Sequence, residues 1–267
     1  MTIGFIGCGN MASAIISGII ESETVRAGDI NIFDIYKPAM DRLTDKYGVH
    51  ALGSEKEIVV NSDTVILAVK PNVLSSVLGK INSVLSESDT LLISIAAGKT
   101  IDFIRNGLSH DNRIIRVMPN INAIVGEAMS AYTANSLATE ADRQLCETVF
   151  GGIGQIIYLE EKQFPLFGVI GGSAPAFAYL FVDALARAGV KNGMKKDTAL
   201  MIAAQTVYGS AKMILDSSSN DHPWELIDRV CSPGGTTIEG IASLQADGFE
   251  AAVMNAVDKA LDKDSKL

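Results

Sequence analysis

The sequence predicts an α/β fold over its first part, with a parallel, doubly wound sheet, followed by an all-helical part. Three observations carry this prediction. Short apolar runs bounded by turn residues alternate with helical patterns up to residue 118. The runs are apolar at consecutive positions, which is typical of strands that helices cover on both faces. From residue 163 onward almost every stretch has helical periodicity.

The strands and helices of the first part alternate as βαβ units on a parallel sheet. The predicted strands are Ile3–Ile6, Ile30–Phe33, Thr64–Val69, Leu91–Ala96 and Ile114–Met118. The predicted helices between them are Met11–Ile20, Ala39–Tyr47, Val73–Leu85 and Ile101–Leu108. After these we expect strands at Ala128–Thr133 and Gln155–Leu159, with a helix at Leu137–Phe150 between them.

The second part should consist of helices alone. They are predicted at Ala174–Gly189, Asp197–Leu215, Trp224–Val230, Thr237–Gln245 and Phe249–Lys263. We place the domain boundary between residues 161 and 162, which gives domains 1–161 and 162–267. Asp197–Leu215 is apolar over more than a narrow stripe, and this pattern fits a core helix or a helix packed against a second subunit equally well.

One uncharged stretch, Phe164–Val182, approaches the length of a membrane span. Pro165, the Gly171-Gly172 pair and Pro175 interrupt it. We therefore expect a turn followed by a new helix start inside a soluble protein rather than one continuous span.

Composition excludes several classes of function. The chain has 267 residues, a formal net charge of -9 and a pI of about 4.8, which argue against a nucleic-acid partner. Three cysteines without CxxC spacing indicate a reducing compartment rather than a disulfide framework. The first apolar strand begins within two residues of Met1, so we expect no signal peptide. The three histidines are far apart and match no metal site.

The stretch Gly7-Cys8-Gly9-Asn10-Met11-Ala12 fits G-x-G-x-x-A between a predicted strand and a predicted helix. In a dinucleotide site, Gly7 permits the tight turn and Gly9 lets the backbone approach a pyrophosphate at the helix N-terminus. Ala12 keeps the helix close to the strand. Because small residues at such a turn also serve packing alone, the βαβ context decides in favour of dinucleotide binding.

Asp34 ends the second predicted strand, where a carboxylate can accept a hydrogen bond from the adenosine ribose. A carboxylate at this point disfavours a 2′-phosphate and indicates NADH. Lys37 is close enough to neutralise a phosphate, so NADPH stays open. The alternative is that Asp34 serves only as a turn residue before Pro38.

Further motifs follow at strand ends and helix starts. They are Ala68-Val69-Lys70-Pro71, Ser94-Ile95-Ala96-Ala97-Gly98, Arg116-Val117-Met118-Pro119-Asn120, Gly172-Ser173-Ala174-Pro175-Ala176 and Ser232-Pro233-Gly234-Gly235-Thr236-Thr237-Ile238. In this order they resemble pyrroline-5-carboxylate reductase over essentially the whole chain. The resemblance implies reduction of 1-pyrroline-5-carboxylate to L-proline with NADPH or NADH. It also implies an N-terminal Rossmann domain, a helical dimerisation domain, homodimers with further assembly left open, and a cytoplasmic setting without a membrane partner.

The resemblance also implies site residues. The substrate carboxylate would be held by backbone N–H groups of Gly234, Gly235 and Thr236 with the Ser232 hydroxyl. Thr237 is the catalytic candidate, orienting the imine nitrogen and relaying a proton. Thr236 and Glu239 also fit a capping box. The expected cofactor-binding residues are Gly7, Gly9, Asn10, Met11, Asp34, Ala68, Val69, Lys70, Pro71, Ala97 and Asn120, with Val69, Ala97 and Asn120 on the nicotinamide side and Lys70 near the phosphates.

Two motifs depart from the family pattern: Ile121 and Asn122 follow Asn120 in one, and Ala174 replaces a glycine in the other. Two other interpretations therefore stay open. One is a reductase of another imine or small acid on the same scaffold. A β-hydroxyacid dehydrogenase would carry a lysine within the helix after the junction, but Ala174–Gly189 has none, only Asp183 and Arg187 at ion-pair spacing. The other is a non-catalytic dinucleotide-binding protein.

Overall fold

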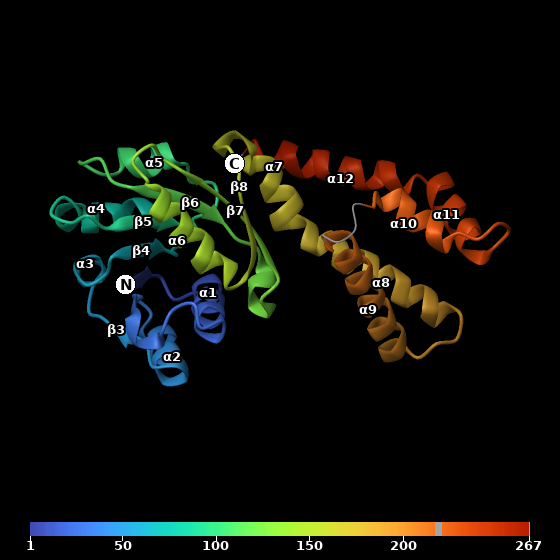
Figure 1. Ribbon diagram of the computed structural model, residues 1–267, viewed down its shortest axis with the longest axis horizontal. Coiled ribbons are helices and arrows are strands. Elements are labelled where there is room, and N and C mark those ends of the chain that lie inside the picture. Colours follow the sequence, from blue (N-terminus) through green and yellow to red (C-terminus); the bar gives the residue numbers. More distant parts are fainter. Residues whose placement is uncertain (217–220, 267) are drawn as a thin grey trace. The chain divides into compact units, whose positions relative to one another are not determined.

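The structure is a computed structural model that describes residues 1–216 and 221–266. The chain divides into two compact units, Met1–Gly172 and Ser173–Leu267. The first unit holds the sheet and the second is helical (Figure 1), which confirms the predicted fold class.

The first unit is built on one eight-stranded sheet with the order β3-β2-β1-β4-β5-β6-β7-β8. Its strands are β1 Ile3–Ile6, β2 Ile30–Phe33, β3 His50–Ala51, β4 Thr64–Leu67, β5 Leu91–Ser94, β6 Ile114–Met118, β7 Ala128–Ala134 and β8 Gly154–Tyr158. Its longer helices are α1 Asn10–Glu21, α2 Lys37–Tyr47, α3 Glu55–Val60, α4 Leu74–Leu85, α5 Ile101–Asn106 and α6 Glu140–Gly151. The order reverses direction at β1 and β4, so the crevice beyond these two strands is where such a sheet binds ligands.

Two separate hydrophobic clusters show that helices cover both faces of the sheet. One cluster joins Phe5 and Ile66 of the sheet to Ile15 of α1 and to residues of α2 and α6. The other joins alternate strand residues, such as Leu67, to Leu78 and its neighbours on α3, α4 and α5. Burial on both faces explains the consecutive apolar residues in the strands.

The sequence prediction missed or misplaced a few elements. It missed β3 and α3, which are short and lack an extended apolar pattern. The predicted strands 64–69 and 91–96 end earlier, at Leu67 and Ser94, because the chain leaves the sheet there to form loops at its edge. The pairing of β6 with β7 is antiparallel, so the sheet is parallel only up to β6 and between β7 and β8.

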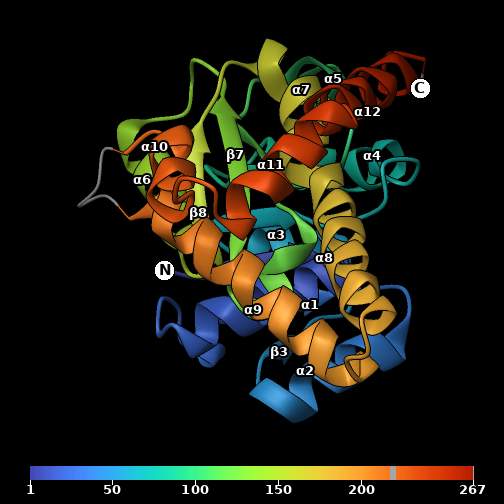
Figure 2. The same ribbon diagram turned by 90° about the vertical axis from the view of Figure 1, so that its right-hand side faces the viewer.

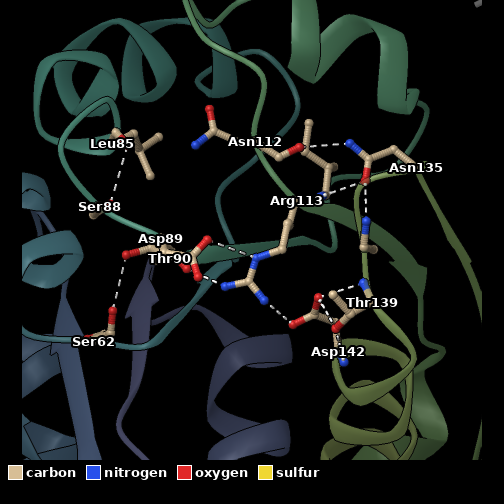
Figure 3. Close-up of polar contacts among 12 residues, drawn as sticks. Ser62, Leu85, Ser88, Asp89, Thr90, Asn112, Arg113, Asn135, Thr139 and Asp142 are labelled. Atoms are coloured by element: carbon tan, nitrogen blue, oxygen red, sulfur yellow. Dashed lines mark hydrogen bonds and ion pairs between the residues drawn. The ribbon is translucent and has the colours of Figure 1, made fainter.

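A polar network closes the edge of the sheet at which the parallel strands begin (Figure 3). Arg113, just before β6, donates to the Asp89 backbone carbonyl and, over 2.5 Å, to the carboxylate of Asp142 on α6. Burial alone would raise the pKa of Asp142, but the hydrogen bonds from Thr139 N–H, the Thr139 hydroxyl and Arg113 lower it below its ordinary value. Asn135 caps the same edge by accepting from Ile114 N–H at 3.1 Å. These charges are paired with one another, so the network is structural.

The chain passes to the second unit through α7 Phe164–Phe167 and the π-helical η4 Gly168–Ser173. Our expectation of a turn here is wrong, because helical geometry continues without a break into α8 Ala174–Lys191. Pro175 has no N–H to offer the Gly171 carbonyl four residues earlier. That carbonyl accepts instead from Asn120 Nδ2 at 2.9 Å. The helical stretch Glu161–Lys191 is long and apolar enough to cross a membrane by length and composition, a test that core helices also pass.

The division between the units falls after Gly172, later than the predicted boundary at residues 161 and 162. The reason is that α7 packs on the sheet. Phe164 and Phe167 form a buried cluster with Ala131 of β7. The Arg116 guanidinium lies 4.4 Å from the centre of the Phe164 ring and forms an ion pair of 3.0 Å with Glu161.

The second unit consists of α8, α9 Lys196–Leu215, α10 Pro223–Val230, α11 Thr236–Ala246 and α12 Phe249–Asp264. Helices α8 and α9 pack side by side (Figures 1 and 2) around Ala186, Ala199 and Ala203. The predicted ion pair between Asp183 and Arg187 is present at 2.5 Å. Helices α10, α11 and α12, all within the described residues, contain no buried residue.

Candidate active site

Three residues from separate parts of the chain meet at one edge of the sheet. In the register of the parallel strands, Ile6 of β1 pairs with Phe33 of β2 and with Leu67 of β4. The next residue of each strand is Gly7, Asp34 and Ala68, and all three therefore follow the strands at the same level. This is the carboxyl edge at the point where the strand order reverses, which is where open α/β sheets bind ligands.

The glycine turn has the shape that a dinucleotide requires. Gly7 has φ of +103°, and a Cβ on it would lie 2.6 Å from the Ala68 carbonyl oxygen, so only glycine fits. Gly9 is the N-cap of α1, and a Cβ on it would meet no atom within 4 Å. Within the described residues no side chain caps α1 and no acidic residue lies in its first turn. The first amides of α1 are thus left for an anion, and these residues fit a pyrophosphate.

Asp34 makes contact with the glycine turn itself. Its Oδ2 accepts the Cys8 N–H at 2.6 Å, and its Oδ1 accepts the Tyr36 N–H at 2.8 Å. The second contact is the turn role considered for this residue. The first places the carboxylate beside the predicted phosphate cradle, so Asp34 serves the local turn and faces the ligand crevice as well.

A cavity of about 490 Å³ opens at this edge. Its lining includes these predicted cofactor residues: Gly7, Gly9, Asp34, Ala68, Val69 and Lys70. Pro71, Asn10 and Met11 do not line it, although Pro71 and Asn10 directly follow lining residues in the sequence. Ala97 is exposed in the loop after β5, outside this cavity.

Asn120 is occupied by backbone groups. It is 5% exposed and caps the short helix η2 Ile121–Val125. Its Nδ2 donates to Gly171 O, and its Oδ1 accepts from Asn122 N–H and Met129 N–H. It does not line the cavity. Its place in the structure is a link between the end of β6, β7 and the π-helical segment.

The structure adds residues that the sequence prediction missed. Ile35 and Tyr36 form one wall of the cavity, and Val73, Ser76, Val77 and Lys80 form another. Glu55 is 7% exposed and its carboxylate is 2.7 Å from Lys80 Nζ. The four residues of the second wall recur at helical spacing directly after Pro71, and this spacing was the available signal for them. Glu55 left no signal, because the short helix α3 was not predicted.

The thiol of Cys8 lies in the glycine turn and is fully buried. Burial, together with the neighbouring carboxylate of Asp34, raises the pKa of Cys8 to about 12. A packing role is therefore the better description of this side chain. Among the described residues no group of three or more His, Cys, Asp or Glu side chains could hold a metal ion.

The second unit contains the predicted substrate loop. Gly235 is the N-cap of α11, and its N–H donates to Ser232 O at 3.0 Å. A Cβ on Gly235 would lie 2.4 Å from Ser232 Oγ, so the loop is built around a glycine here. The predicted capping box of Thr236 and Glu239 is wrong, because Thr236 is already the first helical residue. The first amides of α11 therefore lack a side-chain cap within the described part of the chain, and Thr237 lies exposed in the same turn.

Two family models match the chain. Residues 2–98 match the family described as NADP oxidoreductase coenzyme F420-dependent. Residues 161–267 match the family described as pyrroline-5-carboxylate reductase dimerisation. The two matches correspond to the glycine-turn half of the sheet and to the helical end of the chain.

Relatives of known identity match over the full length. The pyrroline-5-carboxylate reductase of Escherichia coli K12 is 43% identical, with 99% of this chain and 97% of that protein covered. The solved pyrroline-5-carboxylate reductase of Coxiella burnetii has 31% identity and a TM-score of 0.94, over 99% of this chain and 97% of the other. The pyrroline carboxylate reductase of Plasmodium falciparum, solved with NADP bound, has 32% identity and a TM-score of 0.85 over the same shares.

Proposed function

Since this chain belongs to the pyrroline-5-carboxylate reductase family, we propose that it reduces 1-pyrroline-5-carboxylate to L-proline with NADPH or NADH. The observation that supports this most directly is the cavity at the reversal point of the sheet, lined by Gly7, Gly9 and Asp34. Together with the full-length relatives it favours an enzyme over a non-catalytic dinucleotide-binding protein.

The first unit is proposed to hold the cofactor. Gly7 and Gly9 let the backbone approach the pyrophosphate, and the first amides of α1, including Asn10 and Met11, donate to it. Asp34 accepts from the adenosine ribose. Ala68, Val69, Lys70 and Pro71 after β4, with Ala97 and Asn120 after β5 and β6, complete the predicted set. When bound, the cofactor supplies the hydride.

The substrate is a cyclic imine that carries a carboxylate, so its binding requires an anion site. We assign this role to Ser232, Gly234, Gly235 and Thr236. Gly234 has φ of +66° and Gly235 is the N-cap of α11, so successive amides of the loop precede a helix start without a side-chain cap. The Ser232 hydroxyl adds a further donor.

Thr237 is the proposed catalytic residue. A threonine hydroxyl is a weak acid, so it orients the imine nitrogen by a hydrogen bond and relays a proton rather than generating one. Holding the carboxylate and the ring nitrogen at two points fixes which face of the ring receives the hydride, and this positioning is the protein's main contribution to the rate.

The helical unit is proposed to assemble two copies of the chain into a homodimer, with larger homo-oligomers as a further possibility. It leaves large apolar side chains such as Leu180, Met201 and Met254 at least 65% exposed within one chain. We propose a small-molecule substrate, no nucleic-acid or membrane partner, and a cytoplasmic location. We also propose residues 1–161 and 162–267 as the functional domains, since the dimerisation family match begins at residue 161.

The decisive experiment is steady-state kinetics with pyrroline-5-carboxylate and each reduced cofactor. We expect substrate-dependent oxidation of reduced nicotinamide. Thr237→Ala should lower kcat by about tenfold or more while the cofactor dissociation constant changes little. Thr236→Ala is the matched control for kcat, because its proposed contact uses the backbone N–H. A purified, folded protein that oxidises neither cofactor would overturn the proposal.

A further inference from the structure

We infer that this enzyme selects NADH over NADPH, and that Asp34 is the residue that determines the choice. The inference rests on the proposed function and adds a specificity to it. Asp34 lies at the carboxyl end of β2 and lines the cavity beside the glycine turn. A carboxylate there accepts a ribose 2′-hydroxyl and repels a 2′-phosphate.

The carboxylate of Asp34 is held in place on both oxygens. Oδ2 accepts from Cys8 N–H in the glycine turn, and Oδ1 accepts from Tyr36 N–H in the loop after β2. A side chain fixed at two points cannot swing aside to make room for a phosphate. Each carboxylate oxygen has a second lone pair, so a ribose hydroxyl can still donate to it. The carboxylate therefore stays on the ribose side of the turn.

The loop after Asp34 supplies no cation to the cavity. The next two residues are Ile35 and Tyr36, which are 83% and 64% exposed and uncharged. Lys37, which the sequence left as a candidate for neutralising a phosphate, begins α2 and does not line the cavity. An NADPH site instead places an arginine or another cation near this point.

The lysine that α4 contributes to the cavity lining is already paired. Lys80 Nζ lies 2.7 Å from the carboxylate of Glu55, which is buried. Glu55 therefore cancels the positive charge of Lys80 inside the same cavity. The remaining lysine in the lining, Lys70, follows β4 rather than β2. The lining at Asp34 thus presents a fixed negative charge, and the β2 loop supplies no counter-charge to it. Arg42 of α2 is near enough to act on the Cys8 thiol but does not line the cavity.

The test measures cofactor binding directly, without substrate, by titrating the purified protein and following nicotinamide fluorescence. Wild type is expected to bind NADH about tenfold or more tightly than NADPH. Asp34→Asn keeps an oxygen acceptor but removes the charge, and should bring the two dissociation constants within about threefold of each other. Asp45→Asn makes the same change of net charge on the exposed face of α2 and should leave the ratio unchanged.

A second variant covers the case in which Asp34→Asn does not fold, as judged by circular dichroism. Ile35→Arg adds a cation beside Asp34 at an exposed position and should strengthen NADPH binding about tenfold. The inference is overturned if wild type binds NADPH as tightly as NADH, or if neither folded variant shifts the ratio. Failure of the proposed function is distinguishable, because it would appear as no pyrroline-5-carboxylate-dependent turnover while the binding ratio could still be measured.

Discussion

Replacing Asn120 by alanine should lower the free energy of unfolding far more than replacing an exposed asparagine by alanine would. Asn120 is 5% exposed and its side chain makes hydrogen bonds to Gly171 O at 2.9 Å, Asn122 N–H at 3.2 Å and Met129 N–H at 3.3 Å. The partners are backbone groups in three segments of the chain.

The magnitude follows from these contacts. A net hydrogen bond contributes about 1 kcal/mol, and a buried partner left unpaired costs about 1–3 kcal/mol. Counting the shortest bond in full and the two longer ones in part, we expect Asn120→Ala to lower the free energy of unfolding by about 2–4 kcal/mol. Asn120→Asp keeps the acceptor oxygens, but it replaces the donor to Gly171 O by a second acceptor, so it perturbs the contact with the π-helical segment alone.

The assay is urea unfolding followed by far-UV circular dichroism at fixed protein concentration, because assembly makes stability concentration-dependent. Asn106→Ala, an exposed residue at the end of α5, is the matched control and should change the free energy of unfolding by less than about 0.5 kcal/mol. If Asn120→Ala has the same free energy of unfolding as this control and as wild type, the structural role assigned to the side chain is wrong.

Three further predictions use other parts of the first unit. Gly7→Ala should destabilise the protein, because a Cβ on Gly7 would clash with the Ala68 carbonyl. Gly9→Ala should leave the melting temperature unchanged, because a Cβ on Gly9 meets no protein atom. It should instead weaken the binding of reduced nicotinamide cofactor, measured by fluorescence titration. The lowered pKa of Asp142 contributes stability that is complete above its ordinary pKa of 3.8 and is lost as pH falls through the folded-state pKa. In Asp142→Asn, the free energy of unfolding measured with urea should therefore fall less steeply as the pH is lowered below about 4. The same pH dependence as in wild type would contradict the assignment. At pH 8 the Cys8 thiol, whose pKa burial raises to about 12, should resist iodoacetamide in the native protein and react in urea, as read by peptide mass spectrometry.

The sequence predicted the cofactor end of the fold well because its signals are local. Gly7 and Gly9 are two residues apart and lie between a strand and a helix that both have strong apolar patterns. Asp34 follows directly on an equally clear strand. Parallel pairing then brings these strand ends to one edge without further information from the chain.

The contacts that the sequence did not predict join distant positions. Glu55 and Lys80 are 25 residues apart, and Asn120 and Gly171 are 51 apart. Hydrophobic periodicity describes one helix or strand at a time, so it cannot show which side chain of another element forms a hydrogen bond or ion pair with a given polar group. The π-helical segment was missed for the same reason. Pro175 indicated a helix break because it has no N–H to donate, but the side chain of Asn120 donates to the Gly171 carbonyl in its place.

The scarcity of buried residues in the C-terminal helices affects how the chain matures in a cell. The sheet can complete its own hydrophobic clusters as it leaves the ribosome, whereas α10, α11 and α12 contain no fully buried residue within a single polypeptide. If two copies assemble through these helices as proposed, a newly made chain leaves their apolar side chains open to solvent and to proteases until a second copy binds. Abundance of the mature enzyme should consequently rise more steeply than in proportion to the rate of synthesis.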